Sequence, residues 1–416
     1  GKKLDIMKEI MNKSPEHRIM YSSKYKGTSN YWKYSKGQME GFKRIDLVSQ
    51  RKELERKFLE WVTGNEEREE KYGKALELIR EAYKNRKDFK NASQYVLETM
   101  LIGPEITLFA NNASSLKEKL EMSFFKRLFN RKEIKNAKEG LKAKANKHFK
   151  DYHKPTDKDI ALALFSMFKE DIDEEFYPKA FSEGLERHDG NVKSFVEELY
   201  KQSIFTDKEK FNEFVADPES EVIANDPVYN FSQSVFDMYR ELNRKSGQFD
   251  ANLQKGQRLF VDGVMKMKED KTFYPDANST MRLTYGKVGG YKARDAVKYK
   301  YYTTLKGVME KEDPDNYEFR VPEKLKKLYR EKDYGRYGVD GEMRVCFITN
   351  NDITGGNSGS PVLNGKGELI GLAFDSNWEG MTGDIEFEEG MQKTISTDIR
   401  YLLFILDKYG EVDWLI

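Results

Sequence analysis

The chain has 416 residues, with 72 Lys and Arg against 71 Asp and Glu. This length is enough for two or three domains of ordinary size, and the balanced charge gives no reason to expect nucleic acid or an anionic membrane as a partner. No apolar run approaches the roughly 20 residues of a membrane-spanning helix. With one cysteine, Cys346, and four histidines, no internal disulfide can form, and no motif indicates a metal or another cofactor.

From about residue 3 to 272 the pattern is helical. Apolar residues recur at spacings of three and four, as at Val228, Phe231, Val235 and Met238. Thr206, with Glu209 three residues later, has the form of a capping box at a helix start. We predict an all-α helical cap domain over residues 1–273.

The period changes near residues 274–276, because Met281, Leu283 and Tyr285 then alternate with polar residues, and this alternation predicts the first strand. Short β-rich runs follow at 343–349, 360–363 and 368–374, and the glycine-containing stretch 364–367 is typical of a hairpin turn. We predict that residues 274–416 form a second domain, mostly of antiparallel β structure.

Residues 355–361 read Gly-Gly-Asn-Ser-Gly-Ser-Pro, which places Ser358 between glycines and between two apolar strands. Such a loop turns sharply and exposes the hydroxyl, and the amides of Gly356 and Ser358 are placed to stabilise an oxyanion. A glycine-rich hairpin turn also explains a bare Gly-x-Ser-Gly. The apolar strands on both sides favour a nucleophilic serine of the chymotrypsin type.

Three longer strings accompany this motif: Tyr-Lys-Gly-Thr-Ser-Asn-Tyr-Trp-Lys at 25–33, Phe-Asp-Ser-Asn-Trp-Glu-Gly at 374–380, and Thr-Ile-Ser-Thr-Asp-Ile-Arg-Tyr at 394–401. With them the chain resembles, nearly end to end, the bacterial dipeptidyl aminopeptidases of the dipeptidyl-peptidase 7 and 11 type. The resemblance implies an α+β multidomain fold, in which the helical cap is followed by the C-terminal part of a chymotrypsin-like antiparallel β-barrel peptidase domain. It also implies a periplasmic, homodimeric serine peptidase that releases dipeptides from free amino termini through an acyl-enzyme.

Individual roles follow from the same resemblance. Ser358 is the expected nucleophile, and Asn30 and Asp375 are expected to hold the substrate's free amino terminus, since a buried ammonium needs a carboxylate and a carbonyl acceptor. A turn carboxylate and a helix cap are the plain alternatives for these two. The position of Ser376 lines the pocket for the side chain before the cut, and family members that prefer Asp or Glu carry arginine there. We therefore expect apolar or neutral side chains at that position, as in the dipeptidyl-peptidase 7 branch.

A nucleophilic serine needs a base, yet all four histidines (His17, His148, His153 and His188) fall in helical patterns and are interpreted as exposed or capping side chains. In the resembled family the catalytic histidine and aspartate precede the helical insertion. Because the sequence opens on Gly1 with no Met, we expect it to begin inside a longer polypeptide, with both residues upstream, and to be inactive alone.

Several alternatives stay open at this point. The enzyme could prefer Asp or Glu, it could be an endopeptidase, or the chain could be a non-catalytic module that binds a peptide terminus. The acidic stretch 384–389 is interpreted as a surface hairpin rather than a metal site, because no histidine accompanies it.

Overall fold

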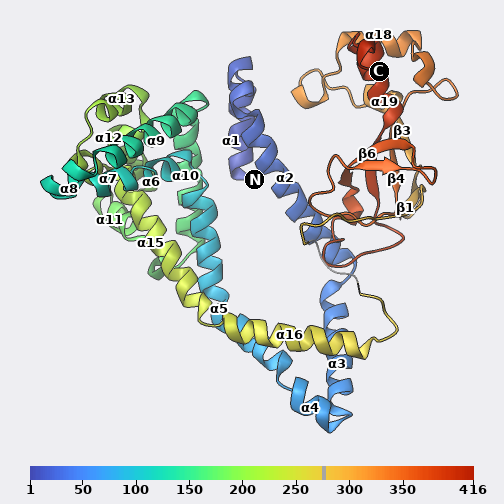
Figure 1. Ribbon diagram of the computed structural model, residues 1–416, viewed down its shortest axis with the longest axis horizontal. Helices are drawn as coiled ribbons and strands as arrows, with labels where there is room; N and C mark the ends of the chain where they lie inside the picture. The colour runs from blue at the N-terminus through green and yellow to red at the C-terminus, as the bar shows by residue number, and fades with distance from the viewer. Residues whose placement is uncertain (274–277) are drawn as a thin grey trace. The chain divides into compact units, whose positions relative to one another are not determined.

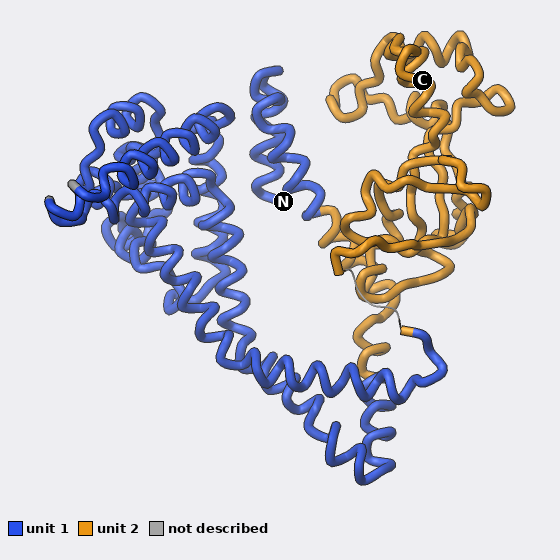
Figure 2. The backbone as a smooth tube through the Cα atoms, viewed as in Figure 1, with its two compact units in different colours: residues 1–32, 53–272 blue, residues 33–52, 273–416 orange. Residues whose placement is uncertain are grey.

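The computed structural model describes residues 1–273 and 278–416. Its residue contacts define two compact units: unit 1, with residues 1–32 and 53–272, and unit 2, with residues 33–52 and 273–416 (Figure 2). The predicted change of period at 274–276, and with it the 273/274 domain boundary, falls at residues outside the described ranges. The extents of the two predicted domains therefore stay a prediction.

Unit 1 is built from helices, as the periodicity predicts (Figure 1). The chain order is α1 (Lys2–Met11), α2 (Pro15–Arg44), α3 (Leu47–Thr63), α4 (Glu66–Tyr72), α5 (Ala75–Tyr95), a π-helix (Val96–Leu101), α6 (Glu105–Asn111), α7 (Ser114–Leu120), α8 (Phe124–Phe129), α9 (Arg131–Lys150), α10 (Lys154–Asp171), α11 (Lys179–Arg187), α12 (Val192–Gln202), α13 (Lys208–Ala216), α14 (Ser220–Ala224), α15 (Pro227–Gly247) and α16 (Asp250–Met267). Helices α2 and α3 contribute residues to both units.

The core of unit 1 follows from apolar faces that pack pairwise. Helix α5 packs against α15 and α16, and the largest apolar cluster is rich in phenylalanine, with Phe165, Phe168 and Phe181 almost fully buried. Aromatic side chains bury a large area each, so they supply much of the stability of such a core.

The predicted capping box is displaced by one residue. Asp207, not Thr206, caps α13, because its carboxylate accepts from the amides of Glu209 and Lys210. The Thr206 hydroxyl is buried and donates instead to the carbonyl oxygens of Tyr200 and Ser203.

Unit 2 contains an antiparallel five-stranded sheet of order β3-β4-β7-β6-β5. These strands are β3 (Tyr302–Thr304), β4 (Arg344–Thr349), β5 (Pro361–Leu363), β6 (Leu369–Ser376) and β7 (Thr394–Asp398), and a separate hairpin joins β1 (Tyr291–Arg294) to β2 (Val297–Tyr299). The predicted strands at 343–349, 360–363 and 368–374 correspond to β4, β5 and β6, and the turn at 364–367 joins the last two. The protein is therefore an α+β multidomain chain.

Three helices, α17 (Leu305–Glu310), α18 (Glu323–Glu331) and α19 (Ile399–Phe404), accompany the sheet. Leu305, Leu328, Met343 and Phe404 meet in the apolar cluster of this unit. This cluster fixes β4 and α19, and so the strands that carry the candidate site.

The strand predicted from the alternation of Met281, Leu283 and Tyr285 is absent. Residues 281–285 have no regular secondary structure, and these three side chains are 100%, 91% and 89% exposed. The alternation of apolar and polar residues predicts that the apolar side chains are buried. Within the described residues, nothing covers these three side chains.

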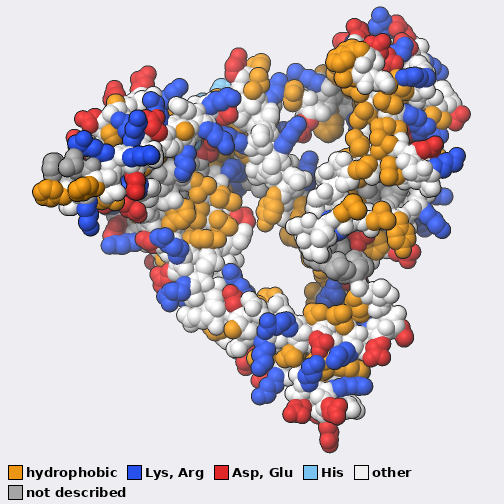
Figure 3. All heavy atoms as spheres, in the orientation of Figure 1, with side chains coloured by type: hydrophobic (Ala, Val, Ile, Leu, Met, Phe, Trp, Pro, Cys, Tyr) orange, Lys and Arg blue, Asp and Glu red, His pale blue; other side chains and the backbone are white. Residues whose placement is uncertain are grey.

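Charged side chains of both signs are interspersed over the visible surface of each unit (Figure 3). This mixture agrees with the balanced composition, 72 basic against 71 acidic residues, and no large field of one sign is visible on this face.

Candidate active site

Ser358 lies in the loop that joins β4 to β5. The loop is held by its own backbone: the Asn357 amide donates to the Thr354 carbonyl (3.2 Å), and the Ser360 amide donates to the Asn357 carbonyl (3.0 Å). Two further bonds tie it to β6, from the Gly359 amide to the Ala373 carbonyl (2.7 Å) and from the Ala373 amide to the Ser360 carbonyl (3.0 Å). A side chain on this loop therefore has a defined position beside the end of β6.

The Ser358 hydroxyl is exposed and donates to the Phe374 carbonyl over 3.4 Å. Gly356 and Gly359 have φ angles of +97° and +82°, a region that only glycine enters without strain. Within residues 1–273 and 278–416, the amides of Gly356 and Ser358 make no hydrogen bond. Both are left to donate to an oxygen that a bound molecule presents.

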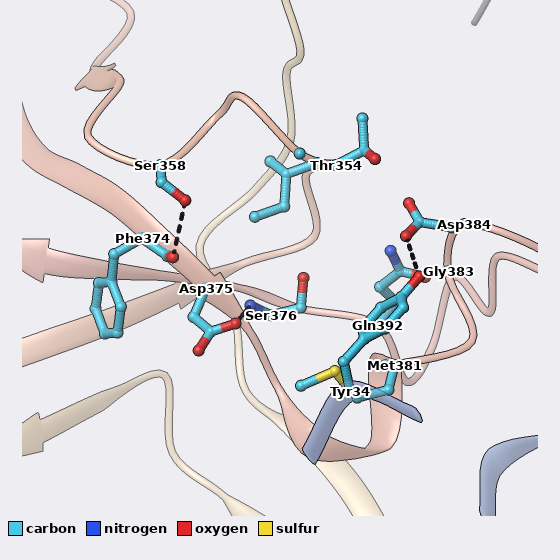
Figure 4. Close-up of a pocket in the computed structure, with 13 residues that line it drawn as sticks. Tyr34, Thr354, Ser358, Phe374, Asp375, Ser376, Met381, Gly383, Asp384 and Gln392 are labelled. Atoms are coloured by element: carbon cyan, nitrogen blue, oxygen red, sulfur yellow. Dashed lines mark hydrogen bonds between the residues drawn. The ribbon is translucent and has the colours of Figure 1, made fainter. Parts of the chain in front are cut away.

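The end of β6 forms one side of a pocket beside this serine. Asp375 and Ser376 line it, and the Asp375 carboxylate accepts from the Ser376 amide (2.8 Å). The pocket has a volume of about 150 Å³, and Figure 4 shows Ser358, Asp375 and Ser376 around it.

The opposite side comes from α2 and from the loop of residues 377–393. Tyr34, Met381, Asp384 and Gln392 line it, and the Tyr34 hydroxyl donates to Asp384 (2.7 Å) while accepting from Gln38 (2.7 Å). Burial and the bond to Asp384 raise the pKa of Tyr34 to about 12, so the phenol is neutral. In the view of Figure 4, Ser358 lies at one side and Tyr34 with Asp384 at the other.

The 377–393 loop is closed at its neck by Asn377. The Asn377 side chain accepts from the Lys393 amide (2.7 Å) and donates to the Met391 carbonyl (3.0 Å). The Asn377 amide also donates to the Lys393 carbonyl (3.0 Å). Three bonds on one side chain and its backbone thus fix the base of the loop that carries half of the pocket.

Helix α2 seats this loop through two glycines one turn apart. A Cβ added to Gly41 would lie 2.4 Å from the Thr382 Cγ2 atom, and one added to Gly37 would lie 2.8 Å from the Met381 Cγ atom. Arg44, one turn further along, pairs with both carboxylate oxygens of Glu388. The close approach requires glycine, and the ion pair adds a directional contact.

The acidic stretch 384–389 is therefore not a surface hairpin. It contains no strand, and three of its carboxylates contact unit-2 residues of α2 and α3: Asp384 with Tyr34, Glu388 with Arg44, and Glu386 with Arg51 (2.9 Å). The error has a simple source, since a local composition does not show which distant cations a loop will meet.

The four histidines all belong to unit 1, and three of them have a polar partner. His17 contacts Ser14 (3.0 Å), His153 contacts Thr156 (2.7 Å), and His188 contacts Glu198 (2.5 Å). His148 differs from the expectation of an exposed or capping side chain. It stacks on Phe109 with ring centroids 4.1 Å apart, and burial lowers its pKa to about 3.

The structure thus brings Ser358, Asp375 and Ser376 to one pocket and places Gly356 in the same loop. Asn30 is exposed on the part of α2 that belongs to unit 1, and its expected role, like those of the other site residues, stays a prediction. Sequence reasoning missed Tyr34 and Gln392 completely. Neither carries a recognisable signal, because both reach the pocket only through the packing of α2 and the 377–393 loop.

Among residues 1–273 and 278–416 no three His, Cys, Asp or Glu side chains are grouped so that they could bind a metal ion. None of the helices in these ranges combines the length and apolar character of a membrane span.

An exposed hydroxyl, two free backbone amides and carboxylates around one pocket define a candidate site for acyl-transfer chemistry. The comparison with known proteins gives the class. The chain belongs to the peptidase S46 family, whose model matches residues 1–416.

Relatives carry two different names. The chain is 38% identical to dipeptidyl-peptidase 7 of Phocaeicola vulgatus, over 100% of this chain and 57% of the relative. It is also 38% identical to the Asp/Glu-specific dipeptidyl-peptidase of Porphyromonas endodontalis, over 99% of this chain and 56% of the relative. The chain therefore spans little more than half the length of these relatives.

Solved structures agree with the fold. The crystal structure of Porphyromonas endodontalis DPP11 in complex with the dipeptide Arg-Glu matches with a TM-score of 0.88 at 37% identity, over 99% of this chain and 58% of that one. The complex with Arg-Asp matches with a TM-score of 0.87. Both neighbours thus hold dipeptides whose second residue is acidic.

Proposed function

We propose that this chain carries the nucleophile and the side-chain pocket of a serine-type dipeptidyl aminopeptidase, which releases dipeptides from free amino termini. One observation carries the proposal: Ser358, Asp375 and Ser376, each given a role by the family resemblance, line the same pocket. Membership of the peptidase S46 family and the names of its dipeptidyl-peptidase relatives support it.

The reaction begins when the Ser358 Oγ atom attacks the carbonyl carbon of the second residue and its proton passes to a base. The amides of Gly356 and Ser358 donate to the oxyanion, a contribution of about 3 to 4 kcal/mol for each such donor. The amine of the remaining peptide leaves with a proton, and water then releases the dipeptide from the acyl-enzyme. Asp375 and Asn30 bind the substrate's ammonium group in this scheme.

Unit 2 does not supply a histidine to act as the general base that takes the proton of Ser358. Residues 33–52 and 273–416 contain no histidine, and burial keeps His148 in its neutral, stacked state. The relatives are much longer than this chain, and we assign the base and its orienting carboxylate to polypeptide outside the 416 residues. The chain alone is then expected to be inactive.

The proposed preference is for apolar or neutral side chains at P1, the residue before the cleaved bond. None of the described residues that line the pocket is Lys or Arg, so an acidic side chain would enter without a lining cation to pair with. An Asp/Glu-specific enzyme is the second candidate, favoured by the names of some relatives and by the dipeptides in the matching crystal structures. A non-catalytic peptide-binding module is the third.

A fluorophosphonate probe tests the serine mechanism in any longer polypeptide that contains this chain. Labelling at Ser358 and hydrolysis of dipeptidyl substrates, both abolished in Ser358→Ala, are the expected results. Blocking the substrate's amino terminus by acetylation should stop cleavage, whereas an endopeptidase would tolerate it. Turnover by the 416-residue chain alone would contradict the assignment of the base. Periplasmic location and homodimer formation, inferred from kinship, are tested by fractionation and by sedimentation.

A further inference from the structure

The pocket carries an excess of negative charge. Its lining includes two carboxylates, those of Asp375 and Asp384, and no lysine or arginine. The neighbouring phenol of Tyr34 stays neutral. Arg282 does not line the pocket, but its guanidinium contacts the Gly355 carbonyl (3.4 Å) and Asn357 (3.2 Å) in the Ser358 loop. A charged side chain that enters on the side of Asp384 therefore meets a carboxylate and no lining cation.

Under the proposed function, bound substrate compensates the charge of only one of these two carboxylates. Asp375 binds the ammonium group of the substrate, and its charge is compensated as soon as the substrate binds. Asp384 has no such partner. Across the described parts of the chain no ion pair involves Asp384. The guanidinium groups of Arg44 and Arg51 are paired instead with two other carboxylates of the same loop, Glu388 and Glu386.

The Asp384 carboxylate is also fixed in place. The Tyr34 hydroxyl donates to its Oδ2 atom, and Gln38, one turn along α2, donates to the Tyr34 oxygen. This chain of bonds starts on a helix, so the carboxylate is held more firmly than an isolated exposed one. Figure 4 shows Asp384 and Tyr34 on the side of the pocket away from Ser358, and in this view Ser376 lies between Ser358 and that side.

We propose that Asp384 is a specificity-determining residue that disfavours an anionic P1 side chain and favours a cationic one. The inference rests on the proposed function, because it assumes that the P1 side chain enters this pocket. It adds a second source of discrimination to that of Ser376. The pocket has a neutral residue instead of a cation at Ser376, and it has a carboxylate without an ion-pair partner at Asp384. Lysine and arginine thereby join the apolar and neutral residues as accepted P1 side chains.

The size of the effect follows from Coulomb's law. Two unit charges about 6 Å apart, in a pocket partly open to water, interact by an amount that changes affinity on the order of tenfold. The effect must have opposite signs for opposite charges, and added salt must weaken both. A change in the shape of the pocket would produce neither signature.

The test measures binding of three dipeptides, Val-Gln, Val-Glu and Val-Lys, to the 416-residue chain by calorimetry at low salt. Val-Gln and Val-Glu have almost the same shape and differ in charge. We expect Val-Glu to bind about tenfold more weakly than Val-Gln, and Val-Lys to bind at least as tightly. In Asp384→Asn the affinity for Val-Glu relative to Val-Gln should rise about fivefold, and the affinity for Val-Lys relative to Val-Gln should fall.

Two control variants accompany Asp384→Asn. Asp384→Glu keeps the charge and should keep the order of affinities, and Asp413→Asn removes an exposed carboxylate of unit 2 that does not line the pocket and should leave both ratios as they are. If the three dipeptides bind but Asp384→Asn shifts the two ratios in the same direction or not at all, the specificity role is wrong and the proposed function stands. If none of the three binds, the pocket is no peptide site and both are wrong.

Discussion

Replacing Gly41 by alanine tests how the pocket is built. The new Cβ would lie 2.4 Å from the Thr382 Cγ2 atom, about 1 Å inside the separation of roughly 3.5 Å at which carbon atoms normally touch. Thr382 is β-branched and 1% exposed, so its methyl group has little room to move. Overpacking of this kind costs about 1 to 3 kcal/mol, against a gain of about 1 kcal/mol in helix propensity.

The matched control is Gly27→Ala on the same helix, where an added Cβ meets nothing within 4 Å. It keeps the propensity gain and lacks the clash. Amide hydrogen exchange of residues 378–384 is the assay, because it reports local opening. We expect Gly41→Ala to speed exchange there by about fivefold to 150-fold, and Gly27→Ala to leave it as in the parent chain.

A second substitution separates the clash from any other effect. Thr382→Ser removes the Cγ2 atom and leaves the Thr382 Cβ position 3.7 Å from the added carbon, an ordinary contact. The variant Gly41→Ala with Thr382→Ser should therefore exchange nearly as slowly as Thr382→Ser alone, with a coupling of about 1 to 3 kcal/mol in the cycle. Equal exchange in Gly41→Ala and Gly27→Ala would refute the seating of this loop on α2.

Three further outcomes are expected. Ser376→Arg should raise kcat/KM for Glu relative to Gln at P1 by about tenfold in an active longer polypeptide, measured with paired fluorogenic substrates. Burial and the Glu105 charge raise the pKa of Asp157 from 3.8 to about 7. Between about pH 4 and 7 the folded chain therefore keeps a proton that the unfolded chain releases, and the free energy of unfolding falls as pH rises through this range. In Asp157→Asn, urea unfolding should show a free energy that depends less on pH over the same range. Arg44→Met, which breaks the pair with Glu388, should speed exchange of residues 386–390 and leave α5 unaffected.

Local sequence patterns predict much of the secondary structure. The helices of unit 1 follow from apolar spacings, and β4, β5 and β6 follow from short β-rich runs between turn residues. These elements were predictable because each one's pattern is set by the surface it buries. The cap of α13 moved by one residue because both Thr206 and Asp207 are capping residues, and burial of the Thr206 hydroxyl decided between them.

The site was predictable only in part. The Ser358 loop has a strong local signature, since two of its glycines have positive φ angles, and Asp375 and Ser376 follow from the family resemblance. Tyr34 and Gln392 could not be found in this way. They are separated from Ser358 by 324 and 34 positions in the sequence, and they reach the pocket because Gly37 and Gly41 let α2 approach the 377–393 loop.

The exposed stretch 281–285 has a practical consequence. This stretch has no regular secondary structure, and its apolar side chains Met281, Leu283 and Tyr285 face solvent. Exposed apolar stretches of this kind promote self-association. The isolated chain should therefore self-associate more readily at high concentration than a protein with this segment covered, so binding measurements on it require a dilute sample. Replacing the three side chains by Thr or Lys offers a route to a well-behaved sample, without touching the residues that line the pocket.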